Sequence, residues 1–251
     1  MFADEDLTRD RFLDGRLTIL QPRAGYRAAM DPVLLAAAVP ARAGEAVLEL
    51  GCGAGVASLC LARRVSGVVI AGVEKQAAYA DLARRNATGN GVVFEVIEGD
   101  IAALPASLRR RSFDHVIANP PYFPPASGTA ARDSGREVAQ REDLALADWV
   151  GVGLRRLKVG GRLTVIQAVD RLPDLLCALG RGTGSTVVLP ITARSGRPAG
   201  RVILQTRKGG RGGFRLLAPF VVHHGTIHLK DGDDLTEAAR AILRHGAAIS
   251  F

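Results

Sequence analysis

Short apolar runs alternate along the chain with longer segments of helical period. Runs of aliphatic and β-branched residues predict strands at 46–50, 68–73, 92–97, 113–118, 163–167, 186–190 and 202–205. The segments between them predict helices at 56–64, 76–90, 143–158 and 171–179. The strand runs are continuously apolar, which is typical of a sheet buried on both faces. The alternation therefore predicts a doubly wound α/β fold, with a Rossmann-like parallel sheet and helices on both faces.

Three segments lie outside this alternation. Residues 1–44 precede the first strand, and a turn and a helix are expected within 25–39. Residues 123–142 predict a loop rich in proline, glycine, serine and arginine, and residues 207–215 predict a glycine-rich, basic loop. No repeat or linker divides the chain, and 251 residues suit one large domain. We therefore expect a single domain of three parts: an N-terminal cap at 1–44, a core at 45–170, and a basic continuation of the same sheet at 171–251.

Charge is distributed unevenly between the two halves of the chain. Residues 1–125 carry 14 basic and 14 acidic side chains, whereas residues 126–251 carry 19 and 11, which accounts for the net charge of +8. No acid occurs between Asp174 and Asp231. The cations of that interval are Arg181, Arg194, Arg197, Arg201, Arg207, Lys208, Arg211, Arg215 and Lys230. Such an asymmetry favours a polyanionic partner, although a general preference for arginine is the alternative explanation.

The remaining composition excludes several classes of protein. No run approaches the roughly 18 apolar residues that a membrane span requires, and the acidic first residues lack the apolar region of a secretory signal. Three sparse cysteines without C-x-x-C spacing favour a reducing cytoplasm over a disulfide framework. We expect no metal site, because the histidines at 223, 224 and 228 lack accompanying cysteines or carboxylates.

A glycine-rich loop follows the first predicted strand and precedes a helix. Its residues, Glu49-Leu50-Gly51-Cys52-Gly53-Ala54-Gly55, have the spacing G-x-G-x-G instead of the dinucleotide fingerprint G-x-G-x-x-G. Small residues let the backbone approach a ligand closely. The acid before the glycines suits a ligand that has no phosphates and a cationic amino-acid end. S-adenosylmethionine fits this description, with Glu49 close to its cationic end.

Two further acids follow the second and third predicted strands. Glu74 is placed to accept hydrogen bonds from ribose hydroxyls, and Asp100 lies within reach of an adenine amino group. Each acid alone is weak support, but all three in register with the loop indicate a nucleoside cofactor. An NAD-dependent dehydrogenase shares the ribose acid and is disfavoured by the loop spacing. The candidate cofactor-binding residues are Glu49, Gly51, Cys52, Gly53, Gly55, Glu74, Asp100, Ile101 and Asn119.

The fourth predicted strand delivers Asn119-Pro120-Pro121-Tyr122 at its carboxyl end, where open α/β sheets bind ligands. Each proline fixes its own φ and disfavours helical backbone before it, so the chain leaves the strand stiff and extended. This backbone can aim the Asn119 side-chain oxygen and the Pro120 carbonyl at one point, and Tyr122 offers a face for a flat base. These four residues are the catalytic candidates.

Two converging acceptors suit an exocyclic amino or amide nitrogen. The lone pair of such a nitrogen is delocalised, and acceptors that grip its two hydrogens favour a pyramidal nitrogen that can attack a methyl group. Orientation and electrostatic stabilisation then replace a strong general base. The tetrapeptide therefore predicts methylation of a planar nitrogen.

With these residues in view, the chain resembles the N-P-P-Y amino-methyltransferases and, more narrowly, the bacterial tRNA(Val) adenine-N6 methyltransferases. The resemblance covers residues 17–170, and its most family-specific part is the segment 25–35. It implies a seven-stranded methyltransferase sheet whose last strand is reversed. It also implies that 25–35 caps the cofactor pocket, with Tyr26 and Asp31 as contacts to ligand.

The leading hypothesis is adenine-N6 methylation of tRNA or another structured RNA, with the base unstacked into the site. Candidate substrate-binding residues, besides Tyr26 and Asp31, are Arg132, Arg136, Arg197, Arg207, Lys208 and Arg211. Two alternatives stay open: methylation of a protein glutamine amide, whose planar nitrogen has similar geometry, and a non-catalytic factor that binds S-adenosylmethionine and RNA.

Overall fold

The computed structural model describes residues 1–121, 144–225 and 234–251. A single-turn helix, η1 (Asp4–Asp6), leads into a hairpin of β1 (Leu7–Phe12) and β2 (Leu17–Pro22), followed by helix α1 (Asp31–Ala38). The remaining described strands form one sheet of nine. These strands are β3 (Ala46–Leu50), β4 (Val69–Glu74), β5 (Phe94–Glu98), β6 (Phe113–Ala118), β7 (Leu157–Ala168), β8 (Thr183–Arg194), β9 (Arg201–Lys208), β10 (Arg215–Leu216) and β11 (Phe220–His223).

The strand order confirms a doubly wound sheet. It runs β10-β8-β9-β7-β6-β3-β4-β5, and β11 also pairs with β8. Pairing is parallel from β5 through β7, whereas β9 is antiparallel to both β7 and β8. Strands β3 to β9 are therefore the expected seven with the last one reversed. The described sheet exceeds that count because β10 and β11 add short parallel pairs along β8, on either side of Pro219, which has no N–H for a ladder.

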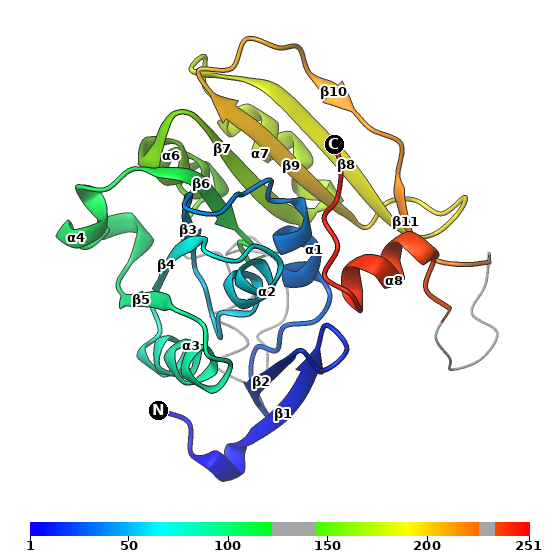
Figure 1. Ribbon diagram of the computed structural model, residues 1–251. Coiled ribbons are helices and arrows are strands. Elements are labelled where there is room, and N and C mark those ends of the chain that lie inside the picture. The colour runs from blue at the N-terminus through cyan, green and yellow to red at the C-terminus, as the bar shows by residue number, and fades with distance from the viewer. Residues whose placement is uncertain (122–143, 226–233) are drawn as a thin grey trace.

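Helices cover both faces of this sheet, as Figure 1 shows. One face packs against α1, α2 (Val56–Arg64) and α3 (Ala77–Gly89), and the C-terminal α8 (Glu237–Leu243) contacts α1. The other face packs against α6 (Leu146–Arg156) and α7 (Leu172–Ala178). The short turns η2 (Ile101–Ala103), α4 (Ala106–Arg109) and η3 (Val169–Arg171) complete the described helices. Residues 47, 117 and 166 face the first layer, and 116, 163 and 165 face the second.

The predicted helix at 143–158 is too long at its C-terminal end. The structure ends α6 at Arg156, and β7 begins at Leu157, which pairs with Phe113 of β6. Pairing with β6 thus takes these residues into the sheet, although their apolar spacing continues that of the helix. At its N-terminal end the prediction extends into residues outside the described part of the chain.

The β1–β2 hairpin is an element that the apolar pattern did not predict. Two asparagines bind the outer edge of β2: Asn86 lies within α3, and Asn90 directly follows that helix. Asn86 accepts from Leu20 N at 2.7 Å and donates to Leu20 O at 3.1 Å, while Asn90 makes the equivalent pair with Thr18 at 2.9 and 2.8 Å. Amide side chains can replace a missing strand partner because each carries both a donor and an acceptor. The hairpin is thereby fixed against α3, and β2 also contacts α2.

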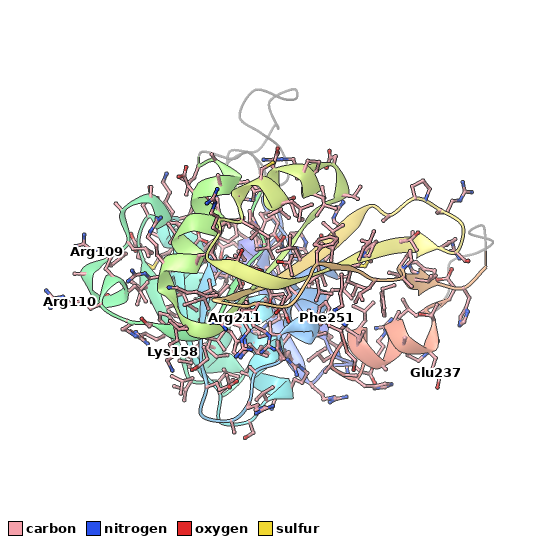
Figure 2. The ribbon with its side chains drawn as sticks, turned by 90° about the horizontal axis from the view of Figure 1, so that it is seen from above. Arg109, Arg110, Lys158, Arg211, Glu237 and Phe251 are labelled. Carbon is pink, nitrogen blue, oxygen red and sulfur yellow. The ribbon has the colours of Figure 1, made fainter. Side chains whose placement is uncertain are left out.

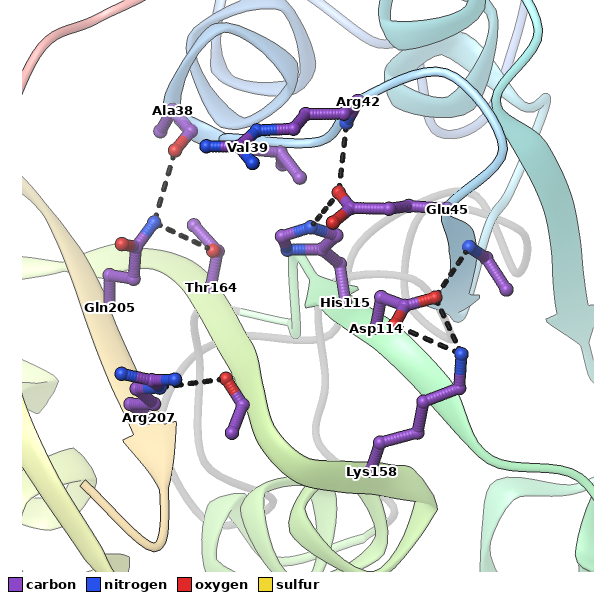
Figure 3. Close-up of polar contacts among 12 residues, drawn as sticks. Ala38, Val39, Arg42, Glu45, Asp114, His115, Lys158, Thr164, Gln205 and Arg207 are labelled. Carbon is purple, nitrogen blue, oxygen red and sulfur yellow. Dashed lines mark hydrogen bonds and ion pairs between the residues drawn. The ribbon is translucent and has the colours of Figure 1, made fainter.

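Polar contacts hold the opposite edge of the sheet, near the amino ends of the parallel strands (Figure 3). Buried His115 lies 3.0 Å from Glu45, and Asp114 accepts from Lys158 Nζ at 2.8 Å and from Ala46 N at 2.9 Å. Burial lowers the pKa of His115, and the Glu45 carboxylate opposes that shift. His115 therefore connects β6 to the residue that precedes β3, at the end of the sheet away from the glycine loop.

Candidate active site

A cavity of about 580 Å³ lies at the carboxyl ends of β3, β4 and β6. Parallel α/β sheets bind ligands at this edge, and the volume is in the range of small-molecule sites. The cavity brings together most of the predicted cofactor residues, namely Glu49, Gly51, Cys52, Gly53, Glu74, Asp100, Ile101 and Asn119. Tyr26 and Asp31, from the predicted cap, also line it.

The glycine loop forms the floor of the cavity between β3 and α2. Gly51, Gly53 and Gly55 have φ angles of 63°, 53° and 84°, a region that side chains other than glycine rarely adopt. At Gly51, a Cβ would lie 2.6 Å from Cη2 of Trp149. Gly55 itself does not line the cavity and instead serves as the N-cap of α2. The spacing of the three glycines therefore bends the chain from strand to helix and lets a ligand approach the backbone.

Glu49 is a buried acid at the end of β3, with only 4% of its surface exposed. Its Oε2 accepts from Ser58 N at 3.1 Å and from the Ser58 hydroxyl. Burial raises the pKa of Glu49 to about 8, the hydrogen bonds from Ser58 oppose the shift, and the charge of Glu74 adds to it. An ionised carboxylate in this position needs a positive partner.

Glu74 and Asp100 line the cavity in different environments. Glu74 is buried at the end of β4 and accepts from Gly53 N and Gln76 N, both at 2.9 Å. Burial raises its pKa, and these hydrogen bonds oppose the shift. Asp100 is half-buried, accepts from Ala102 N at 2.8 Å and pairs with Lys75 at 3.2 Å; the hydrogen bond from Ala102 N, followed by Lys75, lowers its pKa. One wall thus carries two buried acids, and the rim carries one half-buried acid whose pKa is lowered.

Asn119 and the two prolines form the wall beside the glycine loop, because Ala118 of β6 pairs with Leu50 of β3. Asn119 Nδ2 donates to the Tyr26 hydroxyl at 3.5 Å, so Oδ1 is the end of the amide that offers lone pairs. The backbone of Tyr26 is tied to Tyr79, whose hydroxyl accepts from Tyr26 N at 2.8 Å and donates to Tyr26 O at 3.2 Å. Burial, followed by Asp31 and Glu49, raises the pKa of Tyr26, so its hydroxyl stays protonated.

The predicted substrate residues divide into three groups. Asp31 lines the cavity and pairs with Arg201 at 3.2 Å, and Arg197 lies exposed in the turn between β8 and β9, at the same edge of the sheet. The structure does not bring Arg207, Lys208 and Arg211 to the cavity. They follow the reversed strand β9 to the opposite edge, where Arg211 and Lys158 lie in Figure 2. Tyr122, Arg132 and Arg136 lie outside the described residues.

The reversed strand explains why a basic run in the sequence separates in space. Arg201, at the start of β9, pairs with Ala168 at the end of β7, whereas Arg207 pairs with Arg162 in the middle of β7. Arg207 Nε donates to Gly160 O at 2.9 Å and Lys208 Nζ to Leu157 O at 2.8 Å, so both side chains cap the β7 edge. Any contact of these cations with a polyanion is therefore remote from the glycine loop.

Several lining residues were not recognised from the sequence. Trp149 of α6 lies in an amphipathic helix, where a packing role is expected, yet its ring reaches the cavity beside Gly51, and within the described residues its buried Nε1 has no hydrogen-bond partner. Tyr79, Lys75 and Arg201 also line the cavity. Trp149 offered one signal, because it is the only tryptophan of the chain and directly precedes a buried valine in the amphipathic helix.

The donor set fits S-adenosylmethionine. Buried Glu49 and Glu74 supply negative charge for a cationic ligand, the glycine floor admits close approach, and the volume suits a nucleoside with an amino-acid chain. In the ranges 1–121, 144–225 and 234–251, no cluster of three or more histidine, cysteine or acidic side chains is arranged to hold a metal. No helix in those ranges is both long and apolar enough to cross a bilayer.

The sheet order, its reversed β9 and a glycine-lined cavity at the carboxyl edge together define a class I methyltransferase. The family model of the methyltransferase small domain matches residues 30–170. A tRNA1(Val) (adenine(37)-N6)-methyltransferase of Dickeya chrysanthemi is 30% identical over 206 residues, 80% of each chain. The enzyme of that name from Porphyromonas gingivalis (strain ATCC 33277) is 33% identical over 179 residues, 66% of this chain and 68% of the relative.

Solved structures show the same fold. A predicted O-methyltransferase from Agrobacterium tumefaciens superposes with a TM-score of 0.71 at 24% identity, covering 88% of this chain and 98% of the other. The 16S rRNA N2 G1207 methyltransferase of T. thermophilus, solved with AdoMet and guanosine, gives 0.55 at 22% identity, covering 80% and 50%. The chain belongs to the methyltransferase small domain family and is an enzyme that uses S-adenosylmethionine as its cofactor.

Proposed function

We propose that the enzyme transfers a methyl group from S-adenosylmethionine to N6 of an adenine in tRNA. The observation that carries the proposal is the juxtaposition of Asn119 and Pro120 with the glycine floor in one cavity. The relatives from Dickeya and Porphyromonas, whose names specify adenine 37 of tRNA1(Val), support that nucleotide as the target. A tRNA substrate would also support a location in the cytoplasm.

In this proposal, the acids of the wall and the rim bind the cofactor. When bound, S-adenosylmethionine supplies a methyl group on a positively charged sulfur. Glu49 and Glu74 provide the buried negative charge that attracts its cationic groups. Asp100, which the hydrogen bond from Ala102 N and the ion pair with Lys75 hold in its ionised form, accepts from the nucleoside at the rim.

Target binding falls to Asn119 and Pro120. Asn119 Oδ1 and the Pro120 carbonyl accept hydrogen bonds from the two hydrogens of the amino group, which withdraws its lone pair from the ring. Tyr26 accepts from Asn119 Nδ2 and prevents the amide from turning its nitrogen toward the target. As positive charge grows on the attacking nitrogen, the same two oxygens stabilise it and the departing proton. Tyr122 follows directly in the sequence and is proposed to stack on the base.

The experiment supplies methyl-labelled S-adenosylmethionine to the wild type and to Asn119→Ala. Substrates are an unmodified tRNA1(Val) transcript and the same transcript with adenine 37 replaced by guanine, followed by digestion to nucleosides. We expect label in N6-methyladenosine only with the first transcript, and a loss of at least about 100-fold in kcat for Asn119→Ala, since that is the scale for one stabilising group.

Other distributions of label identify the alternatives. Label in a protein band instead of RNA would favour the glutamine amide. Binding of tRNA that is equal in both proteins, without any labelled product, would favour a non-catalytic factor. Label in N6-methyladenosine from the guanine-37 transcript would support adenine-N6 methylation and reject adenine 37 as the target.

A further inference from the structure

One wholly buried polar side chain lies beside the Asn119–Pro121 turn, on the neighbouring strand. Gln167, the penultimate residue of β7, has 0% of its surface exposed. Its Nε2 donates to the carbonyls of Pro120 and Pro121, at 3.3 and 3.1 Å. Its Oε1 accepts from Ala168 N at 2.8 Å, which sets the orientation of the amide. Both ends of this buried amide are therefore satisfied, and its donor end is directed at the turn.

The prolines explain why a side chain is needed there. The β6–β7 ladder extends to Ala118, which pairs with Val165, and continuing this register by two residues places Gln167 beside Pro120. Pro120 and Pro121 have no backbone N–H, so they cannot donate to β7 and can be held only through their carbonyl oxygens. The side-chain amide of Gln167 supplies a donor from β7 and so makes that connection.

The connection bears on methyl transfer because a carbonyl oxygen has two lone pairs. A hydrogen bond from Gln167 to one of them leaves the other for a target amino group and resists rotation of the Pro120 peptide. We propose that Gln167 is a positioning residue for methyl transfer, which directs the Pro120 carbonyl toward the target nitrogen. The proposal rests on the function proposed above, in which that carbonyl is one of the two acceptors.

Packing alone does not account for a glutamine at this position. Leu163 and Val165, which point to the same face of β7, are apolar and buried, as a strand between two helical layers requires. A buried amide is costly unless its hydrogen bonds are made, whereas an apolar side chain has no such cost. The amide therefore serves the turn that it contacts and not the core around it.

The chain offers a matched control in Gln205 on the adjacent strand β9. Gln205 is 7% exposed, and its Nε2 donates to Ala38 O at 3.1 Å and to Thr164 Oγ1 at 3.3 Å. Figure 3 shows these contacts between β9, β7 and the end of α1. Gln205 is buried, as Gln167 is, and donates the same number of hydrogen bonds, but its acceptors do not line the cavity, whereas Pro120 and Pro121 do. A substitution of Gln205 therefore measures the loss of stability caused by removing a buried amide away from the cavity.

The test compares Gln167→Met and Gln205→Met, which keep the side-chain length and remove the donors. We expect both melting temperatures to fall by similar amounts, and the Kd for S-adenosylmethionine and the KM for tRNA to stay within about threefold of wild type. Only Gln167→Met should lose kcat, by about 10- to 100-fold, the scale expected for a misdirected catalytic group. Gln167→Asn keeps a buried donor one methylene shorter, so it provides a folded variant that cannot reach both carbonyls and should also lose kcat.

Unchanged kcat in both Gln167 variants, or a loss no larger than in Gln205→Met, would overturn the positioning role. A loss confined to KM or Kd would do the same, because it would assign Gln167 to binding. If the wild type methylates tRNA and either of these results is obtained, the positioning role of Gln167 is rejected and the proposed function is retained. Wild type that forms no N6-methyladenosine rejects the proposed function and the positioning role together.

Discussion

Glu49 makes cofactor binding dependent on pH. The protein alone holds the pKa of this buried carboxyl at about 8, above its ordinary value of 4.5, so at pH 7 the neutral form predominates. A cation beside the carboxyl favours the ionised form. Binding of S-adenosylmethionine should therefore expel a proton and become tighter as the pH rises toward 8. The same raised pKa contributes stability to the protein alone below pH 4.5, and that stability is lost as the pH rises through 8.

The size of the effect follows from the titration of one group. With a pKa of about 8, about 1 carboxyl in 100 is ionised at pH 6 and about 1 in 11 at pH 7. If the cofactor binds only beside the ionised form, its Kd falls roughly ninefold between these two values. The window ends at pH 7 because the α-amino group of the ligand, with a pKa near 7.7–8.0, remains protonated up to that point.

Calorimetry at pH 6.0, 6.5 and 7.0, in buffers of different ionisation enthalpy, measures both Kd and protons released. We expect release of about 0.9 proton at pH 7 by the wild type, and a smaller pH dependence in Glu49→Gln, where Glu74 is the remaining acid with a raised pKa. Asp100→Asn is the control, because the pKa of Asp100 is lowered and its carboxylate stays ionised throughout the window. This variant should bind more weakly and keep the wild-type slope. A flat wild-type Kd, or an unchanged slope in Glu49→Gln, would refute the role of Glu49.

Three further predictions concern the glycine floor, the Tyr26 contact and the hairpin. Gly51→Ala, with φ at 63° and a Cβ 2.6 Å from Trp149, should cost roughly 1–2 kcal/mol of unfolding free energy and weaken cofactor binding at least tenfold in calorimetry. Gly89→Ala, at a position where a Cβ meets nothing within 4 Å, should be neutral or slightly stabilising; equal effects of the two changes would contradict the steric argument. Tyr26→Phe removes the acceptor for Asn119 Nδ2 and should lower kcat about tenfold with little change in the KM for tRNA; a wild-type kcat would show that Asn119 is oriented by other contacts. Asn86→Ala removes the bonds to Leu20 N, Leu20 O and Ala54 O and should cost about 2–4 kcal/mol in urea denaturation, and a cost below 1 kcal/mol would mean that the hairpin is held elsewhere.

The candidate site was predictable where its residues are consecutive in the chain or end successive strands. Glu49 and Gly51 to Gly55 form one loop, and Glu74, Asp100 and Asn119 each follow an apolar run. Parallel strands bring their carboxyl ends to one edge, so the strand pattern alone predicts that these residues meet. The seven expected strands could be predicted for the same reason, because a strand between two helical layers is continuously apolar.

Residues that act through distant partners gave no such signal. Gln167 ends an apolar strand, and only the register of β7 beside β6 places it against the Pro120 carbonyl. Arg201 and Arg207 belong to one basic run, yet the reversed strand β9 puts the first at the cavity and the second at the opposite edge. The direction of a strand depends on which neighbours it pairs with, and its own residues do not encode that choice.

The amino-acid sequence by itself therefore determined the alternating α/β fold, the glycine floor with its acids, and the proline-stiffened turn after β6. Each of these depends on the conformational preferences and polarity of neighbouring residues. Only the tertiary structure decided how the turn is held, by Gln167 on one side and Tyr26 on the other, and that the β1–β2 hairpin packs on α3. These contacts join residues 46 to 93 positions apart in the chain, and such separations are spanned only when strands and helices pack.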